Sequence, residues 1–304
     1  MSVRTTWFQG SRRARSEALW SYVLISPWIL GFLIWILYPM LASVYYSMTK
    51  YSLLKPPTWI GGENFSTLFR DPLFWQSLRV TVLFSVSYVP LALAFALLLA
   101  SLLNQQIRGL AFFRAAFYLP SVVSGVAISM LWMWGFSNYG FVNGFLRLFG
   151  IKLTSWWTNE RLALPAMVIY SVWLVGGTMI VFLAGLQAIP RHLYEAAEID
   201  GANSVKKFRY ITLPMLSATM FFNLVMGLIA AFQTFTGGFV ITKGGPNYAT
   251  LFYNLYLYEN AFTKLKMGYA SAQAWVLFAI ILVLTLIVFR SSAVWVYYEG
   301  EVRK

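Results

Sequence analysis

The chain has 304 residues, of which 59% are hydrophobic and only 11% are charged. Soluble domains carry about 25% charged residues, so this composition excludes an ordinary water-soluble protein and favours a membrane protein. The chain has no cysteine and one histidine, His192, which excludes disulfides, thiolate metal sites and clusters of histidine ligands, and argues against histidine-based catalysis.

The formal net charge is +13, from 23 Lys and Arg against 10 Asp and Glu. The basic residues stand at the ends of apolar segments and not along one stripe, which argues against nucleic-acid binding. Membrane topology and attraction to anionic lipid headgroups explain this charge.

Six segments are long and apolar enough to cross a bilayer, which takes about 20 mostly apolar residues. Their approximate ranges are 20–47, 77–103, 113–136, 163–188, 214–241 and 269–290. Their interiors carry almost no charge, and Trp and Tyr gather near their ends, as in aromatic belts. We therefore predict an all-α membrane protein, with a transmembrane domain over 20–290 between a cytoplasmic N-terminal segment, 1–19, and a cytoplasmic tail, 291–304.

The orientation follows from the basic residues Arg12, Arg13 and Arg15, which precede the first span and predict a cytoplasmic N-terminus. Six spans then place the C-terminus and residues 190–213 in the cytoplasm as well. The first apolar run is too long for the apolar part of a signal peptide, so we expect it to be retained.

The segments assigned to the outside contain two local patterns. Apolar residues recur with helical spacing in 139–161, which predicts a short amphipathic helix on the outer surface. The segment 242–266 opens with a turn sequence and continues with an aromatic run. The turn residues are Lys243, Gly244, Gly245, Pro246 and Asn247.

Residues 190–213 form a polar segment between the fourth and fifth predicted spans. Pro190 at its start and Gly201 at a C-cap position predict one short helix, and Asn203 or Ser204 can cap a second. The first helix offers small side chains and carboxylates to a partner: Glu195, Ala196, Ala197, Glu198 and Asp200. From the residue types alone, an ordinary cytoplasmic loop is the alternative.

The spacing in this segment resembles a known signature. The pattern is similar to the EAA signature of permease subunits of binding-protein-dependent ABC importers: Glu195-Ala196-Ala197, three intervening residues, Gly201, nine intervening residues, and Ile211-x-Leu213-Pro214. Other stretches resemble the carbohydrate-uptake branch (maltose, oligosaccharides, glycerol phosphates, alginate oligosaccharides) and the first of its two permeases: Ser26-Pro27, Tyr118-Leu119-Pro120 and 267–272. One departure is His192, where many relatives carry an acidic residue.

The resemblance implies the type I ABC importer permease fold, with six transmembrane helices and a cytoplasmic coupling helix between helices four and five. It implies that this segment receives the conformational change of an ATPase through Glu195, Ala196, Ala197, Glu198, Asp200, Gly201, Ile211, Leu213 and Pro214.

The implied partners are a second, similar permease, two copies of a cytoplasmic ATPase, and an extracytoplasmic binding protein. The binding protein would dock on Lys243, Gly244, Gly245, Pro246 and Asn247. The implied location is the bacterial cytoplasmic membrane.

No G-x-x-x-x-G-K-[ST] sequence is present, so this chain does not bind ATP through a P-loop. We predict a transport subunit without catalytic residues, metal or cofactor of its own. ATP and Mg²⁺ would belong to the partner ATPase.

Sugar sites combine aromatic faces with amide and hydroxyl groups. Side chains of these kinds in the last three predicted spans are the substrate-path candidates: Tyr170, Trp173, Asn223, Gln233, Thr234 and Gln273. The alternative for each is a structural role, as an interhelical hydrogen bond or as packing. The sequence does not name the carbohydrate, and the outward Lys and Arg would suit an anionic one as well as a membrane surface.

Two other functions fit the pattern less well. An ion-coupled secondary transporter acting alone would need an ionisable residue within the membrane, and no predicted span has an acidic residue near its centre. A membrane enzyme such as a transferase would need His, Asp and Glu clustered at membrane depth, which the predicted spans lack.

Overall fold

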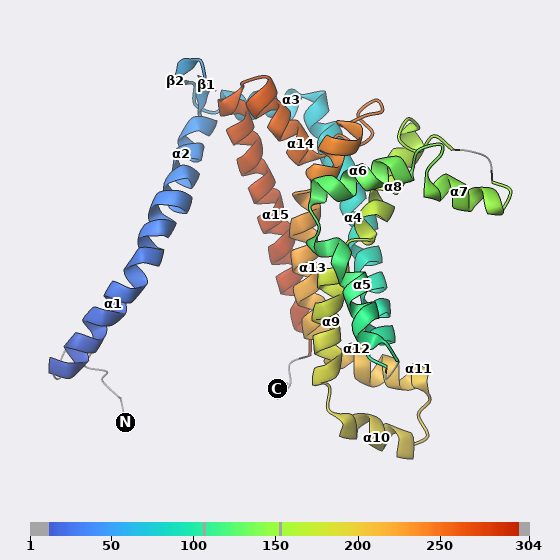
Figure 1. Cartoon of the computed structure of the whole chain (residues 1–304). Helices are drawn as coiled ribbons and strands as arrows, with labels where there is room; N and C mark the ends of the chain where they lie inside the picture. Colours follow the sequence, from blue (N-terminus) through green and yellow to red (C-terminus); the bar gives the residue numbers. More distant parts are fainter. Residues whose placement is uncertain (1–11, 106–107, 152–153, 298–304) are drawn as a thin grey trace.

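The computed structural model describes residues 12–105, 108–151 and 154–297, and these are mostly helical (Figure 1). The predicted terminal segments fall partly in 1–11 and 298–304, which lie outside the described residues. The helices extend between two ends, which we call the hairpin end, where β1 and β2 lie, and the α10 end.

The elements of the first half follow the chain in this order: α1 (Arg12–Phe32), π-helical η1 (Leu33–Leu37), α2 (Tyr38–Ser47), β1 (Thr49–Ser52), β2 (Lys55–Trp59), α3 (Glu63–Arg70), α4 (Pro72–Leu103), α5 (Leu110–Val122), α6 (Gly125–Gly135) and α7 (Phe141–Leu148). The helix α7 confirms the short helix that the apolar spacing predicts in 139–161.

The second half continues with α8 (Glu160–Val172), α9 (Gly176–Ala188), α10 (Arg191–Ile199), α11 (Ser204–Lys207), η2 (Phe208–Thr212), α12 (Leu213–Met215), α13 (Ser217–Phe232), η3 (Gly238–Thr242), α14 (Tyr253–Tyr258), η4 (Glu259–Thr263) and α15 (Met267–Trp295).

Among the described residues, three helices are long and apolar enough to cross a membrane: Ser16–Ser47, α4 and α15. Three bent pairs pass the same test together, which raises the number to six if each pair is one span. The bends measure 100° between α5 and α6, 47° between α8 and α9, and 64° between Ser204–Met215 and α13. The predicted segments 113–136, 163–188 and 214–241 are therefore not continuous helices. The β-branched, Ser and Gly residues at 122–125 are weak helix formers, which fits the sharpest bend.

Two π-helical turns precede prolines. The turn η1 ends two residues before Pro39, and η2 ends two residues before Pro214. A proline ring clashes with the carbonyl four residues earlier, which belongs to Trp35 in η1 and to Tyr210 in η2. A wider turn accommodates that clash while the helix continues.

The core lies along α4 in two buried clusters. Toward the hairpin end, Phe74 and Phe84 of α4 meet Tyr253 and Phe252 edge to face, with ring centroids 5.7 Å and 5.1 Å apart. Toward the α10 end, small residues of α4 pack against α9 around the fully buried Phe182. By contrast α1 extends away from the bundle (Figure 1), whereas α2 meets α15 near the hairpin; the apolar window of Ser16–Ser47 is 0% buried.

The hairpin end is held by close backbone contacts. The strands β1 and β2 pair antiparallel, with Thr49 opposite Trp59. The Asn64 side-chain amide of α3 donates to the carbonyls of Ser47 and Thr49, at 2.8 and 2.9 Å. The first turn of α15 approaches the same strand so closely that a Cβ on Gly268 would lie 2.0 Å from the Thr49 carbonyl oxygen. Only glycine fits this position.

We expect Gly268→Ala to destabilise the hairpin end, because the added methyl group meets backbone, which cannot rotate away. Overpacking of this kind costs about 1–3 kcal/mol. Gly144→Ala is the matched control, since nothing lies within 4 Å of its added Cβ. Thermal unfolding of the purified protein measures both, and equal midpoints for the two variants would contradict the packing argument.

Candidate functional site

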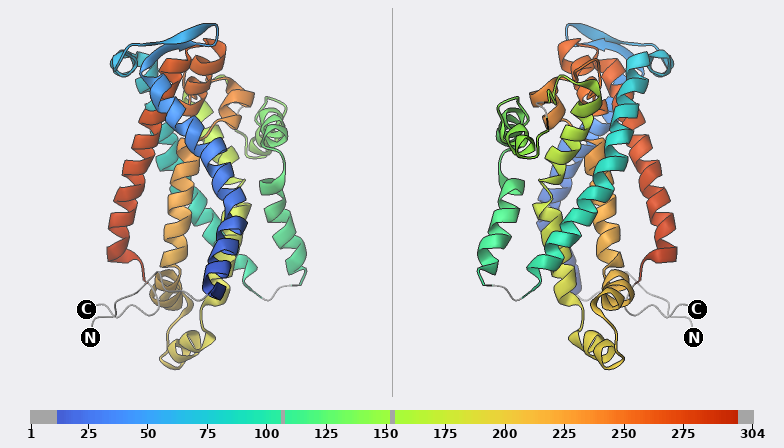
Figure 2. Two further views of the ribbon diagram at one scale, coloured as in Figure 1. Left: turned by 90° about the vertical axis from the view of Figure 1, so that its left-hand side faces the viewer. Right: turned by 90° about the vertical axis from the view of Figure 1, so that its right-hand side faces the viewer.

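The α10 segment (residues 190–213) projects from one end of the helices, and both views of Figure 2 show this. No residue of α10 is buried. Its C-terminus has Schellman geometry: the N–H of Ala202 donates to the Ala197 carbonyl at 2.8 Å, and the N–H of Gly201 donates to the Glu198 carbonyl at 3.0 Å. Gly201 has φ +73°, a left-handed conformation that side chains with a Cβ rarely adopt. The C-cap prediction at Gly201 is confirmed.

The second short helix begins as predicted. Asn203 is its N-cap, with a side-chain oxygen that accepts from the backbone N–H of Lys206 at 2.9 Å. Pro190 occupies the N-cap position of α10. The two helices therefore start and stop where their capping residues dictate, with Gly201 and Asn203 making the bend between them.

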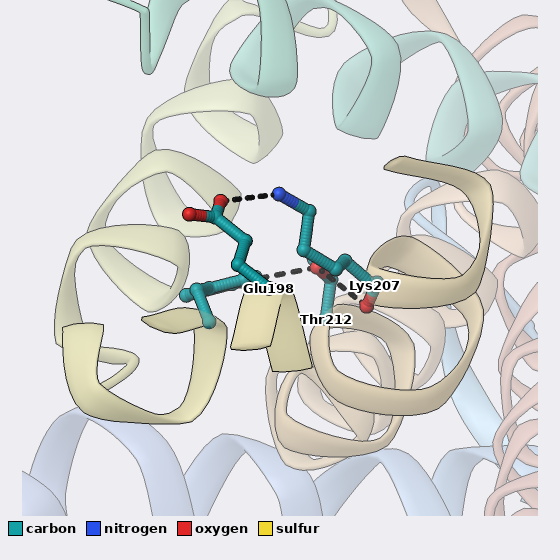
Figure 3. A network of polar contacts seen from close by, with 4 residues as sticks. Glu198, Lys207 and Thr212 are labelled. Carbon is teal, nitrogen blue, oxygen red and sulfur yellow. Dashed lines mark hydrogen bonds and ion pairs between the residues drawn. The ribbon is translucent and has the colours of Figure 1, made fainter. Parts of the chain in front are cut away.

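Two side-chain contacts close the α10 segment on itself (Figure 3). The Lys207 ammonium donates to Glu198 Oε1 at 2.6 Å, joining α11 to α10. The hydroxyl groups of Tyr194 and Thr212 lie 3.0 Å apart, joining α10 to η2. The ion pair is partly exposed, so solvent screens it and it contributes little stability. The sequence reasoning missed both contacts.

The α10 segment has two faces of different character. On one face, Leu193, Tyr194 and Ile211 pack against the buried cluster of α4 and α9. On the other, Ile199 is 88% exposed and Val205 is 73% exposed. The segment therefore has one face anchored in the core and one face with two bulky apolar side chains in solvent.

The link from this segment to α13 passes through a bend. Leu213 and Pro214 lie in α12, and α13 begins only after Leu216. The Ser217 hydroxyl donates to the Pro214 carbonyl at 2.6 Å and accepts from the backbone N–H of Tyr297 at 2.8 Å. The predicted span starting at Pro214 is thus broken, and one hydroxyl joins the bend to the chain just beyond α15.

Three of the substrate-path candidates are buried within this chain: Tyr170 of α8, Asn223 of α13 and Gln273 of α15. The Tyr170 hydroxyl lies 3.0 Å from the Ser129 hydroxyl. The Asn223 amide donates to a carbonyl one turn earlier at 3.0 Å, and Gln273 Oε1 accepts from Asn260 at 3.2 Å. These polar atoms serve contacts inside the chain.

The other three path candidates are more accessible. Trp173 is 38% exposed and meets Trp132 edge to face, with ring centroids 5.5 Å apart. Gln233 is exposed, while its carbonyl accepts from Asn254 at 3.1 Å. Thr234 is half-buried, at the end of α13. Among the described residues, no side-chain hydrogen bond or ring contact joins these three to the buried three, and the part of all six in a substrate path stays a prediction.

The turn predicted at 243–247 lies at the opposite end from α10, between η3 and α14 (Figure 1). Lys243, Gly244 and Asn247 all have positive φ, at 49°, 84° and 43°. The hydroxyls of Thr242 and Thr250 lie 2.6 Å apart across its base. The turn is therefore a closed loop with a fixed backbone.

A partly buried carboxylate, Asp71, is not among the site residues predicted from the sequence. Asp71 caps α4 by accepting from the N–H of Leu73 at 2.9 Å. It also accepts from the hydroxyls of Tyr256 and Tyr269, the latter at 2.6 Å. One side chain thereby joins α4, α14 and α15.

These contacts set the charge of Asp71. Burial raises the pKa of this carboxyl. The hydrogen bonds from Tyr256, Tyr269 and the backbone lower it by more than burial raises it, so the pKa lies below its ordinary value of 3.8. The stabilisation that ionised Asp71 gives to the folded state is fully present above the pKa of Asp71 in the unfolded chain. It is lost as the pH falls through the pKa of Asp71 in the folded chain. Burial and the bond to Asp71 raise the pKa of Tyr256 to about 12, which keeps it a donor.

Residues 89–298 match the family described as binding-protein-dependent transport system inner membrane component. The match covers more than half of the chain, so the chain belongs to this family of membrane permeases. It is 46% identical over 296 residues to the probable ABC transporter permease protein YesP of Bacillus subtilis (strain 168), with 96% of each chain covered. It is 31% identical to the probable starch degradation products transport system permease protein AmyD of Thermoanaerobacterium thermosulfurigenes, covering 89% and 93%.

A solved structure shares the fold. A chain in the crystal structure of a bacterial alginate ABC transporter, in complex with an alginate pentasaccharide-bound periplasmic protein, superposes with a TM-score of 0.80. The similarity covers 92% of this chain and 96% of that chain, at 23% sequence identity. The likeness confirms the type I permease fold expected from the sequence.

We expect Tyr194→Phe to loosen α10, since it removes the hydroxyl contact with Thr212 and leaves the ring in the core. One hydrogen bond contributes about 0.5–1.5 kcal/mol, so amide exchange in α10 should rise about 2- to 10-fold by hydrogen–deuterium exchange. Adding Thr212→Val should produce little further change if the two hydroxyls act as a pair. Additive effects of the two substitutions would contradict this assignment.

Proposed function

We propose that this chain is the permease subunit of an ATP-driven, binding-protein-dependent importer, and that the α10 segment receives the motion of a cytoplasmic ATPase. One observation carries the proposal: the α10 segment is anchored in the core on one side and presents Ile199 and Val205 to solvent on the other. Family membership and the EAA-like spacing support the same assignment.

The proposed mechanism uses the contacts of the segment. An ATPase would hold Ala196, Ala197 and the carboxylates of Glu195, Glu198 and Asp200 in a cleft. Gly201 would fix the bend, while Ile211, Leu213 and Pro214 would transmit the displacement to α13. The Ser217 hydroxyl would carry the same displacement toward the end of α15. Such rigid-body motion is the usual basis of alternating access.

The proposed partners follow from the surfaces that remain. A second permease would complete the pore, and two ATPase copies would supply ATP and Mg²⁺. An extracytoplasmic binding protein would dock at the hairpin end, on Lys243, Gly244, Gly245, Pro246 and Asn247. In this orientation the α10 end and both termini face the cytoplasm of a bacterial cell, and the protein lies in its inner membrane.

We propose a carbohydrate as the cargo. The relatives support this, since AmyD is named for starch degradation products and the solved transporter for alginate. The six path candidates, Tyr170, Trp173, Asn223, Gln233, Thr234 and Gln273, would flank the pathway in the assembled pore.

Purification of the complex tests the proposal. We expect a tagged chain to bring down a second permease and an ATPase, and ATP hydrolysis in liposomes to rise when loaded binding protein is added. Uptake driven by a proton gradient in vesicles that contain this chain alone would refute it.

Gly201 provides a sharper test of coupling. We expect Gly201→Val to abolish stimulated ATP hydrolysis, because a left-handed β-branched residue is strained by more than about 1–2 kcal/mol. Gly201→Asn should keep most of the stimulation, since Asn tolerates this conformation and open space surrounds the site. Both variants should insert and assemble. Full stimulation in Gly201→Val would overturn the role of the bend.

A further inference from the structure

A cavity of about 1070 Å³ lies at the hairpin end. It is bounded by the β1–β2 hairpin, α3, η4 and the start of α15, and its lining includes one side of the Asp71–Tyr256–Tyr269 cluster. None of the six path candidates lines it. The volume lies at the upper end of the range of roughly 300–1,000 Å³ that is usual for small-ligand sites, which leaves room for a short oligosaccharide.

The lining of the cavity is strongly basic. Five cationic side chains surround it: Lys50, Lys55, Arg70, Lys264 and Lys266. Asp71 is the one carboxylate in the lining, and two tyrosine hydroxyls already donate to it. Glu63 and Glu259 stand on the same elements but do not line the cavity. Within the described part of the chain, none of the five cations forms an ion pair, so the lining carries an excess of positive charge.

Two of these cations are presented by a fixed turn. Leu265, between Lys264 and Lys266, has φ +54°, which is uncommon for a residue with a side chain. Backbone bonds of 2.8 Å from Lys264 to Glu259 and from Lys266 to Asn260 hold that turn. The Lys264 ammonium lies 4.9 Å from the centroid of the Tyr256 ring. The strained turn therefore sets both lysines at the cavity beside an aromatic surface.

The remaining lining is typical of sugar binding. Three tyrosines, Tyr51, Tyr256 and Tyr269, contribute to it together with hydroxyl and amide side chains: Ser52, Thr58, Thr67, Asn64 and Asn260. Aromatic rings pack against the apolar faces of sugars, while hydroxyls and amides bond their OH groups. The unpaired cations select for negative charge on the same ligand.

We propose that this cavity binds a carboxylated oligosaccharide, such as a short uronate chain, at the outer face of the permease. Its use as a loading site for cargo rests on the proposed function, but binding itself does not. A phospholipid headgroup shares the anionic chemistry. The several polar and aromatic lining groups and the volume favour the saccharide.

The test uses the complete importer complex without its binding protein, in nanodiscs of phosphatidylcholine. A galacturonate tetrasaccharide and the neutral maltotetraose are titrated at low and high salt, by calorimetry. We expect the acidic sugar to bind and the neutral one to bind at least 10-fold more weakly, with acidic binding falling as salt rises. Equal binding of the two sugars, or no binding of the acidic one, would overturn the proposal.

Two variants locate the binding. Lys264→Gln with Lys266→Gln should weaken acidic binding at least 10-fold, and Lys55→Gln, on the hairpin, should weaken it independently of the strained turn. Arg147→Gln removes a charge from exposed α7, outside the cavity, and should change nothing. Unaltered affinity in both cavity variants would refute the site.

Nanodiscs that contain phosphatidylglycerol test whether an anionic lipid headgroup, and not the saccharide, occupies the cavity. If that lipid occupies the cavity and blocks the sugar, the saccharide assignment fails. Stimulated ATP hydrolysis is read separately in the same preparation. A coupled complex that binds no acidic sugar contradicts only this inference, whereas sugar binding by a chain that assembles with no ATPase contradicts only the proposed function.

Discussion

The packing of α4 is the constraint on which the rest of the structure depends. It contributes buried residues to both clusters, with aromatic residues toward the hairpin end and small residues toward the α10 end. Ala96 and Ala100 are fully buried and let α9 approach closely, as small residues do between membrane helices. Asp71 caps the same helix and ties it to α14 and α15. The helix α4 therefore connects the packing at the two ends of the molecule.

The two ends of the molecule differ in how they are built. The α10 end consists of short capped helices with exposed side chains, held by single contacts such as Tyr194 to Thr212. The hairpin end consists of close backbone approaches, such as Gly268 against Thr49, and of a basic cavity fixed by a strained turn. The first arrangement suits a surface that another protein moves, and the second suits a surface that receives a ligand without changing shape.

Local chemistry made part of this structure predictable from the sequence. Apolar length located the helices and bent helix pairs that are long and apolar enough to cross a membrane. Capping chemistry located the end of α10 at Gly201 and the start of α11 at Asn203. The bends in three of the segments were not predictable, because they depend on neighbours that pack beside the weak helix formers. The bonds from Tyr256 and Tyr269 to Asp71 join residues 185 and 198 positions apart, and no sequence spacing reports such a contact. The cavity depends on the same long-range packing.

The first helical run is attached at one end only. Near the hairpin, α2 packs against α15, where the Trp275 indole N–H donates to the Ser43 hydroxyl at 3.1 Å, while the apolar window of Ser16–Ser47 is 0% buried. The apolar side chains of this window are not covered by the rest of the chain, so lipid or a neighbouring protein covers them. A protein that packs against this run and binds only the folded chain stabilises it. The stability of this subunit then depends on the concentration of that neighbour.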